Sequence, residues 1–166
     1  RGQSFMAGDK IQMLLPSRDC RTYTPVTWDA QNGRTELLVY HHNDSPSGAW
    51  IRGLRKGDVC RFVGPQRSLR VPTNGAPIVL FGDETSCAVA RAIVAATSPA
   101  RLICVFEARA EEATRLALGE LGERTTLVWR DPDDAHLERV VDGLATALER
   151  VGAELLLTGR AQAIQG

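Results

Sequence analysis

The sequence has no net charge, no long apolar run and no closely spaced pair of cysteines. Its 166 residues include 20 Lys and Arg and 20 Asp and Glu, so the formal net charge is zero. A zero balance gives no global attraction to nucleic acid or anionic membranes. No apolar run reaches the roughly 18 residues of a membrane span, and residues 1–25 lack the pattern of a signal peptide. We therefore expect no nucleic-acid partner, no stable membrane insertion and a cytoplasmic location.

Motifs for metal binding and for hydrolysis are also lacking. Cys20, Cys60, Cys87 and Cys104 are widely spaced, whereas a zinc site or a redox dithiol favours close pairs. We expect them to be small buried side chains in a reducing compartment. The sequence contains no G-x-S-x-G, no H-E-x-x-H and no clustered catalytic carboxylates, which disfavours hydrolases. We expect no metal site.

Residues 1–73 have the pattern of short strands and loops. Segments 11–15, 35–40 and 59–63 are typical of strands, with the turn signals Asn32-Gly33 and Gly64-Pro65 beside them. A short helix is expected at 48–54. We interpret this half as a small antiparallel β-barrel or sandwich.

Residues 74–166 instead alternate strands and helices, after a joint at 73–77. The expected strands are 78–81, 102–106, 126–129 and 154–157, and the expected helices are 86–96, 110–121 and 133–150, the last capped by Asp131 before Pro132. The strands are apolar throughout, which is typical of a parallel sheet with helices on both faces. We expect two domains, 1–73 and 74–166, with a ligand at the carboxyl ends of the parallel strands.

The segment Arg21-Thr22-Tyr23-Thr24 has the chemistry of a flavin nucleotide site. In an extended segment, Arg21 and Tyr23 point to one face. An arginine fork binds phosphate oxygens, an aromatic ring stacks on a flat heterocycle, and a threonine can hydrogen-bond a ring nitrogen. The alternative is an ordinary strand with a surface arginine.

Residues 41–50, HHNDSPSGAW, lead from a strand through a polar loop to a short helix. Backbone N–H groups at such a helix start can bind an anion, and Gly48 allows close approach of the backbone. A metal pair of His41 and His42 is the alternative. Adjacent histidines in a strand point to opposite faces, and no third ligand is nearby in the sequence.

The segment after the first parallel strand is Gly82-Asp83-Glu84-Thr85. Its backbone N–H groups and the Thr85 hydroxyl could bind pyrophosphate, although it matches neither G-x-G-x-x-G nor a P-loop. Its carboxylates would repel phosphate unless they point away, so helix capping is the alternative. Arg130 could meet an adenosine 2′-phosphate, or form a surface salt bridge with Asp131 or Asp133.

Four segments occur in a recognisable order: RTYTP, HHNDSPSGAW, RKGDVCRFVGP and VLFGDETSCAVARAI. Together they resemble the siderophore-interacting protein family, flavin-dependent ferric-siderophore reductases related to ferredoxin–NADP reductases. The resemblance extends over most of the chain, to residue 163. It implies an antiparallel FAD-binding β-barrel followed by a parallel-sheet NAD(P)H-binding domain. Because the family is longer at both ends, we expect both domains to be incomplete.

The resemblance assigns FAD contacts to the first half. It implies that Arg21 holds the FAD phosphates, that Tyr23 stacks on the isoalloxazine and that Thr24 lies beside flavin N5. Tyr23 and Thr24 are therefore the catalytic candidates. The remaining FAD contacts implied are His41 and, at the helix start under the pyrophosphate, Gly48, Ala49 and Trp50.

The resemblance also implies a nicotinamide cleft, lined by Gly82, Asp83, Glu84 and Thr85 and by a turn at Gly159 and Arg160. Two positions differ from the family pattern. Gly48 replaces the usual serine, which removes a hydroxyl contact and keeps the backbone contacts. Arg160 replaces the usual glutamate, which changes the charge on the nicotinamide side.

The function implied is reduction of a ferric siderophore. NADPH or NADH would reduce the flavin, which would pass single electrons to Fe(III), and Fe(II) would leave its hard oxygen ligands. Two alternatives remain open. The chain could reduce a carrier such as ferredoxin, flavodoxin or quinone, or it could bind flavin or nucleotide without catalysis. We expect a monomer with a ferric siderophore as its small-molecule partner.

Overall fold

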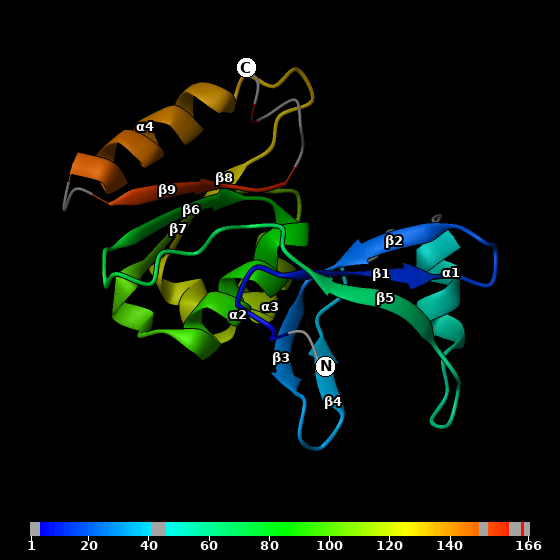
Figure 1. The fold of residues 1–166 in the computed structure, drawn as a ribbon. Coiled ribbons are helices and arrows are strands. Elements are labelled where there is room, and N and C mark those ends of the chain that lie inside the picture. The colour runs from blue at the N-terminus through cyan, green and yellow to red at the C-terminus, as the bar shows by residue number, and fades with distance from the viewer. Residues whose placement is uncertain (1–3, 41–45, 150–152, 160–163, 165–166) are drawn as a thin grey trace.

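The computed structural model describes residues 4–40, 46–149, 153–159 and 164 (Figure 1). The first half of the chain is built from antiparallel strands, and the second half is a four-stranded parallel sheet flanked by helices. This order of an antiparallel and a parallel unit is the one that the sequence predicts. Each helix within the described ranges is too short or too polar to cross a lipid bilayer.

The first half contains two antiparallel sheets and one helix. Its elements are β1 (Lys10–Leu14), β2 (Cys20–Tyr23), β3 (Pro25–Asp29), β4 (Arg34–Leu37), α1 (Pro46–Gly53) and β5 (Arg61–Gln66). β1 lies between β2 and β5 in one sheet, and β3 pairs with β4 in the other. The described strands pair into two sheets, and their closure into the expected barrel stays a prediction.

Alternation along β1 gives this half its core. The side chains of Ile11, Met13 and Leu15 point to one side and are buried. They pack against Tyr23, Trp28, Leu37 and Trp50 from the surrounding elements.

Pairing between strands moves two of the predicted boundaries. β5 begins two residues later than expected because its ladder with β1 ends at the Leu14–Arg61 pair, and Val59 is 88% exposed. β4 is shorter than expected because its ladder with β3 ends at the Pro25–Leu37 pair. A ladder needs a partner strand, which the pattern of one segment does not reveal.

The second half is a parallel sheet in the order β8-β7-β6-β9. Its strands are β6 (Ile78–Gly82), β7 (Leu102–Ala108), β8 (Thr125–Trp129) and β9 (Glu154–Leu157). Its helices are α2 (Cys87–Ala96), α3 (Glu111–Leu118) and α4 (Leu137–Glu149), with short 3₁₀ helices η1 (Glu84–Ser86), η2 (Pro99–Arg101) and η3 (Gly119–Arg124).

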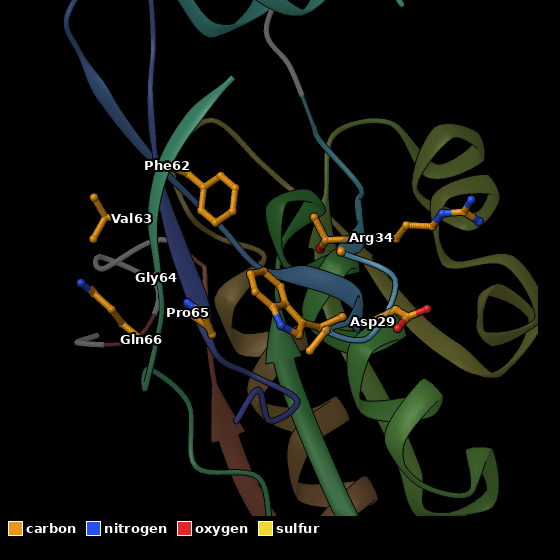
Figure 2. Close-up of a pocket in the computed structure, with 11 residues that line it drawn as sticks. Asp29, Arg34, Phe62, Val63, Gly64, Pro65 and Gln66 are labelled. Carbon is orange, nitrogen blue, oxygen red and sulfur yellow. The ribbon is translucent and has the colours of Figure 1, made fainter. Parts of the chain in front are cut away.

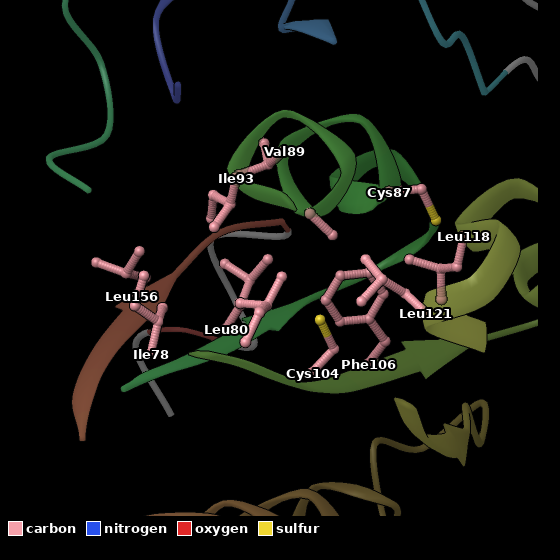
Figure 3. Close-up of a cluster of buried hydrophobic side chains, with 12 residues drawn as sticks. Ile78, Leu80, Cys87, Val89, Ile93, Cys104, Phe106, Leu118, Leu121 and Leu156 are labelled. Atoms are coloured by element: carbon pink, nitrogen blue, oxygen red, sulfur yellow. The ribbon is translucent and has the colours of Figure 1, made fainter. Parts of the chain in front are cut away.

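Helices cover both faces of this sheet, as the unbroken apolar strands predict (Figure 1). Ile78 and Leu80 of β6 point toward α2 and α3, where they pack with Ile93 and Phe106 in the largest buried cluster (Figure 3). Val79, on the other face, packs under α4 together with other buried side chains. Because both faces of β6 are covered, all five of its residues are buried.

Two predicted helices begin or end at a different residue. The segment predicted as helix from 133 starts at Leu137, because residues 131–136 form turns in which Asp134 has a φ of 61° and His136 is buried. Helix α3, which was predicted to extend to residue 121, ends at Leu118. Gly119 follows with a φ of 62°, and the chain continues as η3.

The two halves contact each other directly. Leu38, Leu69 and Val71 pack against the buried cluster beneath α2. On the surface, Arg91 of α2 forms an ion pair with Glu36 of β4 at 3.2 Å. These contacts place the first half against the helix that follows β6.

The cysteines divide into a buried pair and an exposed pair. Cys87 and Cys104 lie in the largest buried cluster, and burial raises the pKa of each to about 12. Cys20 and Cys60 are exposed free thiols at the start of β2 and just before β5. The expectation of buried thiols is therefore correct for the first pair and wrong for the second.

A maleimide at mildly alkaline pH should label Cys20 and Cys60 rapidly in the native protein. Cys87 and Cys104 should react only after unfolding, because the thiolate is the nucleophile and burial suppresses it. Peptide mass spectrometry locates the labelled sites. Rapid labelling of Cys104 in the native protein would contradict its position in the core.

Candidate functional site

Five of the residues that the sequence singles out meet at a cavity between the two halves. This cavity has a volume of about 640 Å³ and is lined by Arg21, Tyr23 and Thr24 from the first half. Thr85 and Gly159 line it from the second half. β6, the first strand of the parallel sheet, lies between β7 and β9, so the strand order reverses beside it. Ligands of open parallel sheets bind at such a reversal.

Strand alternation places Arg21 and Tyr23 together on β2. Both side chains are partly buried, and Arg21 Nη1 donates to the Cys20 carbonyl at 2.9 Å, which uses one of five guanidinium donors. Burial raises the pKa of the Tyr23 phenol, while the Arg21 charge and a hydrogen bond with Ser47 oppose that rise. Tyr23 therefore presents a neutral ring beside a cation.

Helix α1 reaches the cavity through Ser47 and not through the residues that the resemblance assigned. Gly48 is buried, Ala49 is exposed, and none of Gly48, Ala49 and Trp50 lines the cavity. Trp50 packs against the apolar cluster of β1, and its contact with the cofactor stays a prediction. Successive helical residues point about 100° apart, so only one of these neighbours faces the cavity.

The turn after β6 is shaped by its own carboxylate. Asp83 Oδ1 accepts the Thr85 N–H at 2.8 Å and the Thr85 hydroxyl at 2.6 Å, and the Asp83 N–H donates to Ser86 Oγ at 3.2 Å. This capping box begins η1, which confirms the capping alternative for Asp83. Thr85 and Ser86 line the cavity, whereas Asp83 and Glu84 are buried outside its wall.

The ends of β6 and β9 approach too closely for side chains at two glycines. A Cβ atom on Gly82 would overlap the side chain of Ser86. A Cβ atom on Gly159, whose φ is +96°, would lie 3.1 Å from Asp83 Cγ. The position of Gly159 in the turn therefore requires glycine on both steric and conformational grounds.

Hydroxyl groups connect the same two strand ends. Thr158 Oγ1 donates to the Phe81 carbonyl at 2.8 Å and lies 2.9 Å from Ser86 Oγ. Because Thr158 has one hydroxyl proton, Ser86 donates in the second contact. The floor of the cavity is thus a hydrogen-bonded set of small polar groups.

Below this floor, a buried arginine connects the carboxyl ends of β6, β7 and β8. The Arg130 side chain is only 7% exposed. Its Nη2 lies 3.1 Å from Glu107 of β7 and 3.2 Å from Glu84 after β6, with Asp83 at 3.9 Å. Glu84 also accepts the Arg109 backbone N–H at 2.6 Å. Three carboxylates therefore surround one guanidinium.

His136 completes this cluster from the segment before α4. Its Nε2 lies 2.7 Å from Glu107 Oε2, and its Nδ1 accepts the Asp131 backbone N–H at 3.1 Å. Because Nδ1 accepts, Nε2 carries the proton and donates to Glu107, which makes His136 a neutral imidazole. This buried contact draws residues 131–136 to the sheet edge and explains why α4 starts late.

The surface salt bridge expected for Arg130 does not match this geometry. Its ion-pair partners are Asp83, Glu84 and Glu107 in place of Asp131 or Asp133, and Asp131 pairs with Arg139 at 2.7 Å. The guanidinium is buried among carboxylates, and its contact with a 2′-phosphate stays a prediction. Arg130 pairs with Glu107 because β7, which carries Glu107, lies beside β8 in the sheet. A partner so distant in the chain cannot be identified from the local sequence.

Several cavity residues had no strong signal in the sequence. Ser47, Ser68 and Thr158 line the cavity, as does Tyr40, whose pKa is raised by burial and by the nearby Glu84 charge. Tyr40 also lines an adjacent cavity of about 270 Å³. The sequence indicated a role for Tyr40 at the cavity only through its position, at the end of the strand predicted at 35–40 and just before the polar loop.

Two predicted residues, His41 and Arg160, lie outside the described residues, as does His42. Among the residues that the structure does describe, no three His, Cys, Asp or Glu side chains converge as metal ligands would.

A larger cavity of about 720 Å³ lies elsewhere, between the β3–β4 hairpin and β5 (Figure 2). Trp28, Phe62 and Pro65 form its apolar wall, and Asp29 and Arg34 lie at its hairpin side. It contains none of the predicted site residues. Convergence of polar groups, and not size, therefore identifies the candidate site.

Replacing Arg130 by methionine should leave three buried carboxylates without their shared cation. We expect unfolding free energy to fall by about 3–5 kcal/mol. The matched control is Arg139→Met, where the ion pair is 54% exposed on the arginine side and the loss should stay below about 1 kcal/mol. Urea unfolding followed by tryptophan fluorescence measures both, and equal stability of the two variants would refute the role given to Arg130.

Comparison with known proteins supports the resemblance found in the sequence. Residues 6–69 match the family model of the siderophore-interacting FAD-binding domain. No curated protein sequence matches the chain.

Solved structures share its fold. The siderophore-interacting protein of Acinetobacter baumannii is 20% identical with a TM-score of 0.61, over 93% of this chain and 65% of that one. A siderophore utilization protein from T. fusca is 21% identical with a TM-score of 0.57, over 98% and 72% of the two chains. Ferredoxin-NADP+ reductase from Plasmodium falciparum is 10% identical with a TM-score of 0.66, over 98% and 74%.

The chain thus spans about two thirds to three quarters of the length of these proteins. At these identities the likeness establishes the fold alone. Residues 6–69 are thus similar to the siderophore-interacting FAD-binding domain, in a chain that shares the fold of ferredoxin-NADP+ reductase.

Proposed function

We propose that this protein binds FAD in the cavity between its halves and reduces a ferric siderophore with electrons from a nicotinamide donor. Residues 1–73 would form the FAD-binding domain and residues 74–166 the donor-binding domain. The observation that carries the proposal is the single cavity that Arg21 and Tyr23 share with the carboxyl ends of β6 and β9. The family match of residues 6–69 supports it.

The described residues fit the parts of FAD. The cavity volume of about 640 Å³ falls within the about 300–1,000 Å³ typical of ligand sites. Arg21 would bind phosphate oxygens through its fork, and the neutral Tyr23 ring would stack on the flat ring system. Thr24 would hydrogen-bond the ring edge. Ser47 holds Tyr23 by a hydrogen bond and so positions that ring.

The opposite wall suits the donor. Thr85, Thr158 and Gly159 present small groups, so a planar ring could approach the cavity without meeting a bulky side chain. Asp83 and Glu84 are turned toward Arg130, which removes the like-charge repulsion that they would exert on phosphates. His41 and Arg160 remain candidate contacts from the resemblance alone.

FAD, when bound, supplies hydride acceptance from a reduced nicotinamide and transfer of single electrons to Fe(III). The protein contributes placement of the two reactants and exclusion of water, and its described cavity residues need to move no proton. Ferric ion is the substrate. Fe(II) fits hard oxygen donors less well than Fe(III), so the siderophore would release it.

A second function is favoured by the fold. The likeness to ferredoxin-NADP+ reductase from Plasmodium falciparum, with a TM-score of 0.66, makes a carrier protein an alternative electron acceptor. The same flavin and donor contacts would serve that reaction, so only the acceptor distinguishes the two.

The purified protein should take up FAD, turn yellow and lose its flavin absorbance when reduced nicotinamide is added without oxygen. A ferric siderophore should then restore the absorbance, and a ferrous chelator should trap two Fe(II) per donor oxidised. Failure to bind FAD would end the proposal. Reoxidation by ferredoxin or flavodoxin, but not by ferric siderophores, would support the second function instead.

Arg21→Ala should weaken FAD binding. Each charge-assisted hydrogen bond to phosphate contributes on the order of 1.5–3 kcal/mol, so the dissociation constant should rise at least tenfold. Arg61→Ala is the matched control, because Arg61 is exposed on β5 and lies outside the cavity wall. Quenching of flavin fluorescence measures both. Unchanged affinity in Arg21→Ala would remove this residue from the site.

A further inference from the structure

Arg130 holds two strand ends together through a single nitrogen. Its Nη2 donates to Glu107 Oε1 of β7 at 3.1 Å and to Glu84 Oε2 of the turn after β6 at 3.2 Å. An Nη nitrogen carries two protons, so these two contacts use both of them. Arg130 Nε, in contrast, is buried and has no hydrogen-bond partner among the described residues. The guanidinium is therefore shared between two carboxylates, with one donor left unsatisfied.

An arginine and a carboxylate frequently pair in another way, in which two parallel N–H groups donate to both carboxylate oxygens. Glu107 and Arg130 would form that bidentate pair if Glu107 Oε2 accepted the Nε proton. The pair would also satisfy a buried donor, which is costly to leave without a partner. The observed contact instead joins Nη2 and Oε1. A further group must therefore hold the second oxygen of Glu107.

His136 is that group. Its Nε2 donates to Glu107 Oε2 at 2.7 Å, and both side chains are fully buried. Its Nδ1 accepts the Asp131 N–H at 3.1 Å, which fixes the ring and places the proton on Nε2. Because Oε2 is engaged by His136, Glu107 presents Oε1 to Arg130.

The contacts continue from Arg130 to the wall of the cavity. Glu84 takes the second Nη2 proton, and Asp83 Oδ2 lies 3.9 Å from the same nitrogen. The other oxygen of Asp83 accepts both the N–H and the hydroxyl of Thr85, which lines the cavity. A continuous series of polar contacts thus joins His136 to the wall formed by the turn after β6.

We propose that His136 is a positioning residue for the donor side of the cavity, an inference that rests on the proposed function. By holding Glu107 Oε2, it keeps Arg130 shared between β7 and the turn after β6. Without it, Glu107 takes both Nε and Nη2 of Arg130. The turn that carries Glu84 then loses its cation, and Thr85 loses its fixed position.

Two substitutions of His136 separate this role from a purely local one. The amide of glutamine reaches the place of the imidazole Nε2, and the shorter amide of asparagine reaches the place of Nδ1. His136→Gln therefore keeps the donor to Glu107, whereas His136→Asn keeps only the acceptor for the Asp131 N–H. Should His136 serve only the segment 131–136, the Gln variant would carry the defect.

The first readout is hydrogen exchange followed by NMR, in protein to which no cofactor has been added. In His136→Asn, the Thr85 amide should exchange at least about tenfold faster than in the wild type, because its turn opens more often. The Arg130 Nε resonance should shift, since Nε gains an acceptor. Both signals should stay as in the wild type in His136→Gln.

The second readout connects the role to the proposed reaction. With FAD bound, His136→Asn should raise the KM for the nicotinamide donor by about fivefold or more while kcat changes by less than about twofold. FAD affinity should be unchanged, because Arg21 and Tyr23 lie on the opposite wall. His136→Gln should have the KM of the wild type. If His136→Asn does not fold, His136→Leu replaces it, since leucine also lacks the donor to Glu107.

The outcomes distinguish the inference from the proposed function. Unchanged Thr85 exchange in His136→Asn, or a larger defect in His136→Gln, would overturn the inference. Faster exchange with an unchanged KM would overturn the role of His136 in donor binding. If exchange changes as expected but no nicotinamide donor reduces the wild type, the proposed function fails and the link from His136 to the turn stands.

Discussion

The buried cation of Arg130 is the constraint on which the candidate site depends. A guanidinium taken out of water needs acceptors, and Glu107 supplies one from within β7. Glu84 and Asp83, which point inward from the loop after β6, form further ion pairs with the Arg130 guanidinium. Their inward orientation leaves Thr85 and Ser86 facing the cavity. The loop can thus carry two carboxylates and still offer uncharged groups to a ligand.

The cavity has two walls of different chemistry. The wall from β2 supplies a cation and a neutral ring, and the wall from the parallel sheet supplies hydroxyl groups and glycine. Such a division suits a ligand with phosphates, a flat ring and a second flat partner. Packing of Leu38, Leu69 and Val71 onto the core beneath α2 brings the walls together. The site is therefore a product of the junction between the halves.

Local patterns account for most of the fold. The apolar runs of β6, β7 and β9 and the amphipathic segments between them were sufficient to predict a parallel sheet covered on both faces. Alternation was sufficient to place Arg21 beside Tyr23. The ends of β4 and β5 were misplaced because a ladder with a partner strand sets them. The short strands were sufficient to predict an antiparallel half, whereas closure of a barrel depends on which strands pair.

The sequence by itself determined the residue chemistry of the site: an arginine and a tyrosine two residues apart, and a Gly-Asp-Glu-Thr turn after a buried strand. Only the tertiary structure decided what those residues do. Asp83 and Glu84 became partners of Arg130, and Trp50 became part of the core, while Ser47 and Thr158 reached the cavity. The physical reason is that burial and pairing depend on neighbours distant in the chain, such as Glu107 beside Arg130, and these are fixed by strand order.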